Sequence, residues 1–93
     1  MEKVNHPEHY AETGCPCECI EVIHYVTKDV EPITAFSIGN AIKYLWRLGK
    51  KEPDENMGQT MDEKILEDLK KASWYLDDAI EMMTLKIESK SLR

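Results

Sequence analysis

The feature that most constrains this chain is a long, uninterrupted helical pattern toward its carboxyl end. The pattern opens at Thr60, whose hydroxyl can cap the helix while the carboxylate of Glu63 reaches back to the capping residue. We expect a helix over residues 60–88, about 40 Å long. Apolar side chains repeat at helical spacing and form its expected buried stripe: Ile65, Leu69, Ala72, Leu76, Ala79, Ile80 and Met83.

Shorter helical patterns precede the long one. Apolar residues from Cys19 to Val26 give one face to a helix over residues 18–28. Pro32 stops that helix and can open the next, which we expect over residues 33–49, ending at Gly49. The packed face of this middle helix is expected to comprise Ile38, Ala41, Ile42, Leu45 and Leu48.

The sequence therefore predicts an all-α fold: a single helical domain over residues 1–93, with three helices and an irregular arm at residues 1–17. A domain of this size buries only roughly 60–65% of its unfolded surface. The long helix also exceeds what two shorter helices can cover, and Trp46 and Trp74 would supply interface area. We therefore expect a homo-oligomer.

The charge balance excludes several partners. The formal net charge is -6, from 18 acidic and 12 basic residues, which argues against general nucleic-acid binding. A basic island from Lys43 to Lys51 still allows a small phosphate-bearing ligand. The sequence has no run of about 18 apolar residues that would predict a membrane span, and the amino terminus lacks a signal-peptide core. We expect a cytoplasmic protein with no membrane contact.

Polar side chains form a stripe along the middle helix. Asn40, Lys43, Tyr44 and Arg47 occupy positions i, i+3, i+4 and i+7. A matching stripe on the long helix comprises Lys64, Asp68, Lys71, Tyr75 and Asp78. If the helices are antiparallel neighbours, Asp68 could orient Arg47 or Lys43, and Lys71 could add a third cation for an anionic group. The alternative is a solvated face with local ion pairs on each helix.

Residue types that bind zinc are concentrated in the arm and at the start of the first expected helix. They are His6, His9, Cys15, Cys17 and Cys19. Their spacing does not match common structural zinc sites, which leaves Cys15 and Cys17 as weak candidates and assigns Cys19 to the apolar core. Carboxylates from Glu67 to Glu81 lie on one helix with none facing them, so the sequence predicts no metal site there, and magnesium would be needed only for catalysis.

Three blocks of the sequence together carry a family resemblance: Asn5–Tyr10, Gly39–Arg47 and Glu67–Leu76. They resemble the SaV-like family of small phage proteins, whose domain also occurs in a phage nucleotide kinase. The resemblance implies nucleotide binding in the cytoplasm of an infected bacterium, without the P-loop that the sequence lacks. It assigns to the nucleotide or its phosphates Asn5, Tyr10, Asn40, Lys43, Tyr44, Arg47, Asp68, Lys71 and Tyr75. His6 and His9 would be the proton carriers of a catalytic site.

Three functions stay open at this point. The first is a nucleotide-binding protein, with or without phosphoryl transfer as a (deoxy)nucleoside monophosphate kinase. The second is a non-enzymatic antagonist of host defence that sequesters a cyclic or other nucleotide signal. The third is a module that binds a host protein through its acidic surface. The cofactor requirement of each remains unknown.

Overall fold

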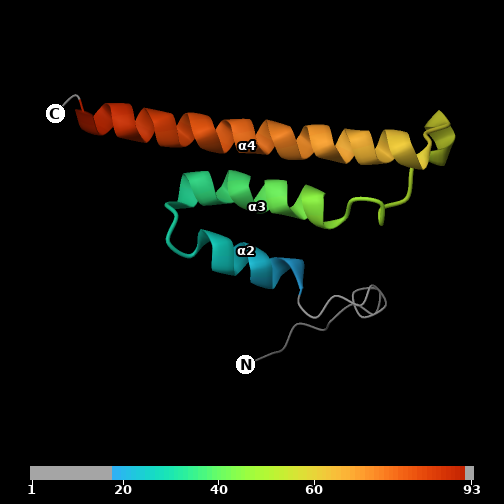
Figure 1. Ribbon diagram of the computed structural model, residues 1–93, viewed down its shortest axis with the longest axis horizontal. Helices are drawn as coiled ribbons and strands as arrows, with labels where there is room; N and C mark the ends of the chain where they lie inside the picture. The colour runs from blue at the N-terminus through green and yellow to red at the C-terminus, as the bar shows by residue number, and fades with distance from the viewer. Residues whose placement is uncertain (1–17, 92–93) are drawn as a thin grey trace.

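The computed structural model describes residues 18–91, which form three α-helices and a short 3-10 helix (Figure 1). Helix α2 spans Cys19–Thr27, α3 spans Pro32–Trp46, η1 spans Glu55–Met57 and α4 spans Met61–Ser91. No strand occurs within residues 18–91, so the predicted all-α fold is confirmed. None of these helices combines the length and the apolar character that a membrane crossing requires.

Helix α4 begins at the predicted capping box. The backbone amide of Thr60 donates to Oε1 of Glu63 at 2.9 Å, and the amide of Glu63 donates to Oγ1 of Thr60 at 3.1 Å. These bonds satisfy two amides that have no partner within the helix. From this start α4 continues for 31 residues, about 46 Å.

Helix α3 begins as expected and ends earlier than expected. Pro32 occupies its first turn, and the carboxylate of Glu31 accepts a hydrogen bond from the amide of Thr34 at 3.1 Å. The last helical residue is Trp46, whereas the sequence predicted residue 49. The chain leaves the helix because Arg47 takes a non-helical conformation and Gly49 follows at a φ of 73°.

The helices lie side by side in one open layer (Figure 1). Helix α3 is the middle member, with α2 on one side and α4 on the other, and neighbouring helices run antiparallel. Helices α2 and α4 do not contact each other. In a closed three-helix bundle each helix would touch the other two, so the described residues form a layer whose two flat faces are uncovered.

Small residues allow the helices of this layer to approach closely. Ala41 on α3 and Ala72 on α4 are almost completely buried, and the hydroxyl of Ser37 donates a hydrogen bond to the carboxylate of Asp78 across the same interface. On the other side of α3, a Cβ at Gly39 would lie 3.1 Å from Cγ2 of Ile23. The α2–α3 approach therefore depends on that glycine.

The predicted buried stripe of α4 is wrong for four of its large residues. The exposed fractions are 42% for Leu69, 44% for Leu76, 63% for Ile80 and 38% for Met83. Ala72 and Ala79 are buried as predicted, because α3 covers a flank of α4 that also contains Lys64 and Asp68. Leu45 of α3, predicted to be packed, is also exposed. One layer of helices buries one flank of α4 and leaves the larger apolar side chains in contact with solvent.

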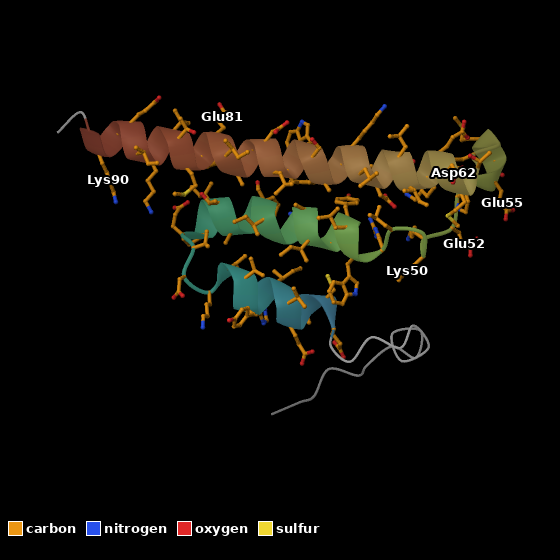
Figure 2. The ribbon with its side chains drawn as sticks, in the orientation of Figure 1. Lys50, Glu52, Glu55, Asp62, Glu81 and Lys90 are labelled. Atoms are coloured by element: carbon orange, nitrogen blue, oxygen red, sulfur yellow. The ribbon has the colours of Figure 1, made fainter. Side chains whose placement is uncertain are left out.

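We expect Ala41→Leu to lower the free energy of unfolding by about 1–3 kcal/mol, because the added atoms have no space between α3 and α4. Thermal and urea unfolding measure this change. Glu81→Leu is the control, since Figure 2 shows Glu81 on the side of α4 that points away from α3. Equal stability of the two variants would contradict the packing described for Ala41.

Candidate functional site

Aromatic rings from α3 and α4 meet on one side of the helix layer. Tyr44 and Tyr75 stack with their ring centroids 5.9 Å apart and their planes 13° from parallel. Phe36 and Trp74 contact the ring of Tyr75 edge to face, at centroid distances of 6.5 and 5.0 Å. The predicted polar stripes of the two helices therefore do meet, and the Tyr44–Tyr75 stack is their point of contact.

Three cationic side chains surround the ring of Tyr44. Arg47 Cζ lies 4.7 Å from the ring centroid, Lys43 Nζ lies 5.1 Å from it and Lys71 Nζ lies 5.5 Å from it. At these distances each cation is attracted by the ring, but the three charges also repel one another. We call these three cations, with Tyr44 and Tyr75, the cationic site.

Carboxylates compensate only part of this charge. Glu67 accepts a hydrogen bond from Lys71 at 2.8 Å. No carboxylate within residues 18–91 forms an ion pair with Lys43 or Arg47. The Nε atom of Arg47 is buried and has no hydrogen-bond partner among the described residues. A buried donor without a partner is costly, so this position is suited to an acceptor that residues 18–91 do not supply.

Glu67 is held in its charged form by its neighbours. Hydrogen bonds from Lys71 and from Nε2 of Gln59 lower the pKa of Glu67 from 4.5 to about 2. The same bond to Glu67 raises the pKa of Lys71. Glu67 therefore fixes Lys71 at the edge of the cationic site over the whole range near neutral pH.

The prediction that Asp68 orients Arg47 or Lys43 is wrong. Its Oδ1 atom accepts from Lys64 at 3.2 Å, one turn earlier on the same helix. Both side chains lie in the flank of α4 that α3 covers, and Asp68 is fully buried. The second oxygen of Asp68 is buried and has no hydrogen-bond partner within residues 18–91. The local ion pair, which the sequence offered as the alternative, forms because the two residues share this flank.

The remaining predicted site residues divide into two groups. Asn40 lies on the same helix as Tyr44, but its Nδ2 atom donates to the carbonyl oxygen of Phe36 at 2.9 Å, so this donor is occupied within α3. The others lie outside the described residues, and their predicted roles are not tested: Asn5, His6, His9, Tyr10, Cys15 and Cys17. Within residues 18–91, no group of three or more His, Cys, Asp or Glu residues is arranged to hold a metal ion.

Cys19 connects α2 to the cationic site. It is a free, buried cysteine, as the sequence predicted, and burial raises the pKa of its thiol. The nearby charges of Lys43 and Arg47 act in the opposite direction and lower that pKa. Cys19 is therefore close enough to Lys43 and Arg47 for their charges to affect its thiol.

Sequence reasoning missed the contributions of Phe36 and Trp74. Phe36 precedes Asn40 and Tyr44 at four-residue intervals, a spacing that places all three on one side of α3. Trp74 borders an open, shallow hollow on α4 whose lining is Glu63, Leu66, Glu67, Lys70, Lys71 and Trp74. Lys71 belongs to both the hollow and the cationic site, so an exposed indole lies close to the cations.

The chain belongs to the DUF3310 family, which is described as a family of proteins of unknown function. Residues 4–77 match this family, a range that includes all members of the cationic site. No curated protein and no solved structure matches the chain. Membership therefore identifies the domain without assigning it an activity, and a functional argument has to start from the geometry of the site.

We expect Asp68→Ala to lower the free energy of unfolding by about 3 kcal/mol, because it leaves the ammonium of Lys64 buried with only the longer 3.5 Å contact to Glu67. The double variant Lys64→Met/Asp68→Leu should be at least as stable as the wild type, since it removes both buried charges. Chemical denaturation of the three proteins measures this. A double variant no more stable than the single one would show that the charges themselves are required.

We expect Glu67 to contribute to stability in a pH-dependent way. Its folded-state pKa is lowered, so the contribution is complete above the ordinary value of 4.5 and is lost as the pH falls toward about 2. The difference in melting temperature between the wild type and Glu67→Gln should therefore be constant near neutral pH and should shrink across this acidic window. A difference that does not change with pH would mean that Lys71 and Gln59 do not hold the charged form.

Proposed function

We propose that this protein binds a nucleotide or a closely related phosphorylated ligand at the cationic site. The observation that supports this most directly is the state of Arg47, whose guanidinium lies against Tyr44 and whose buried Nε atom has neither a carboxylate nor another hydrogen-bond partner within residues 18–91. A phosphate oxygen is a suitable acceptor for that donor, and Lys43 would add a second charge. The chain's formal charge of -6 makes a local cluster of free cations distinctive.

The surrounding aromatic residues support a ligand with a base as well as a phosphate. Trp74 is 64% exposed beside Lys71 and can offer an indole face to a purine or pyrimidine. Tyr44 is half-buried between the cations and is positioned mainly as a rigid support for them. A phosphate at Arg47 and Lys43 with a base near Trp74 would use both parts of the site.

Phosphoryl transfer is the further step in this proposal. The described part of the site supplies charges that can position and neutralise phosphates, which is most of what such transfer requires. A proton carrier would come from His6 or His9, as the resemblance to the SaV-like family implies. On this reading the protein acts in the cytoplasm of a phage-infected bacterium as a nucleotide kinase without a P-loop. Binding without transfer would instead make it a sink for a nucleotide signal.

We expect calorimetric titration with nucleoside mono-, di- and triphosphates and cyclic dinucleotides to reveal a ligand of the wild type. Arg47→Ala should then weaken its binding by about 1.5–3 kcal/mol, because a charged hydrogen bond is lost. Lys90→Ala is the matched control, since it removes one cation from the far end of α4 (Figure 2). No binding of any compound by the wild type, or an equal effect of both variants, would contradict the proposed site.

The histidines separate transfer from simple binding. We expect the double variant His6→Ala/His9→Ala to retain ligand affinity and to lose phosphate transfer from ATP to a nucleoside monophosphate, because these residues would move protons without carrying the binding charges. A chromatographic assay of the products measures the transfer. Wild-type protein that binds the ligand without converting it would identify a sink and not a kinase.

A further inference from the structure

Apolar residues on α4 follow a heptad repeat and remain exposed. Successive members of this repeat are alternately three and four residues apart, which is the spacing of the a and d positions in a coiled coil. We call this set the α4 seam: Leu66, Leu69, Ser73, Leu76, Ile80, Met83 and Ile87. Its ends are 21 residues apart, so it is about 32 Å long. Within residues 18–91 the apolar members of this set are 38–63% exposed.

The seam lies on one flat face of the helix layer. At 3.6 residues per turn, its mean direction is about a quarter turn from the flank that packs on α3, where Asp68 and Ala72 are buried. Lys71 and Tyr75 lie in the opposite direction around the helix from that flank, toward the other flat face. The seam and the cationic site therefore point away from each other.

We propose that the α4 seam docks against the α4 seam of a second copy of this chain, with the two helices antiparallel. A two-fold interface needs a surface that is complementary to itself, and a heptad seam with apolar residues at all of its a and d positions except Ser73 meets that requirement. The second copy would add the second layer that a helical domain needs to enclose an apolar core.

Charge complementarity selects the antiparallel orientation. When Ser73 of one copy faces Leu76 of the other, Leu69 faces Ile80 and Leu66 faces Met83, so the apolar layers match. In the same register Lys70, which occupies an e position beside the seam, faces Asp77 of the second copy. The two-fold symmetry creates a second pair of the same kind. In a parallel pairing Lys70 would face Ile65 and Asp77 would face Ala72, and no such ion pairs would form.

The proposed dimer does not depend on the proposed nucleotide function. The three cations would remain accessible in the dimer, because they lie on the flat face opposite the seam, whereas the hollow beside Trp74 shares Leu66 and Lys70 with the proposed interface. Loss of ligand binding and loss of dimerisation are therefore separable by experiment.

Light scattering coupled to size-exclusion chromatography tests the seam. We expect the wild type to have the mass of a dimer, and Leu76→Glu to have the mass of a monomer, with the dimer dissociation constant raised roughly a hundredfold or more. The helical circular dichroism of Leu76→Glu should survive, since Leu76 is already 44% exposed in the single chain. The matched control is Leu85→Glu: Leu85 is 49% exposed on the same helix but lies outside the seam, and the variant should remain dimeric.

A charge exchange tests the orientation. We expect Lys70→Glu to weaken the dimer roughly tenfold, because two attractive pairs become repulsive, and the double variant Lys70→Glu/Asp77→Lys to restore it. A monomeric wild type overturns the proposal, as does an oligomer that Leu76→Glu leaves intact. A dimer that Leu76→Glu dissociates but that the double variant fails to restore overturns the antiparallel register.

Discussion

The packing of α3 against the small-residue flank of α4 determines most of this structure. Ala41 and Ala72 let the two helices approach, and the hydrogen bond from Ser37 to Asp78 joins them across the same interface. This contact brings Tyr44 beside Tyr75 and so assembles cations from two helices around one ring. Because α4 uses this flank for its own chain, its large apolar residues remain available for another one.

The elements of the fold could be predicted from local signals, and their relative orientation could not. The capping box of Thr60 and Glu63 and the helix-opening Pro32 are chemical features of short segments, and the structure contains both. Local signals do not show which flank of α4 packs against α3. Helix α4 has two stripes at helical spacing, one of leucines and one of alanines and polar residues. Periodicity shows that each stripe shares a face, but it does not show which partner covers it.

The candidate site was predictable to a similar degree. Spacing identified Lys43, Tyr44, Arg47, Lys71 and Tyr75, and the structure brings them together. The role expected for Asp68 failed because Lys64, one turn away on the same helix, is buried beside it and pairs with one of its two carboxylate oxygens. Within residues 18–91 the cations of α3 thus have no carboxylate partner, which is the property that makes the site a candidate for phosphate.

The end of α3 at Trp46 determines how Arg47 is held in the cationic site. Arg47 is held by the turn that leads to Gly49, and not by a regular helical backbone. A substitution in that turn can therefore reorient the guanidinium of Arg47, while the helix interface keeps Tyr44 and Lys43 in place. Such a substitution in the turn after Arg47 would change the geometry of the three cations without replacing any of them.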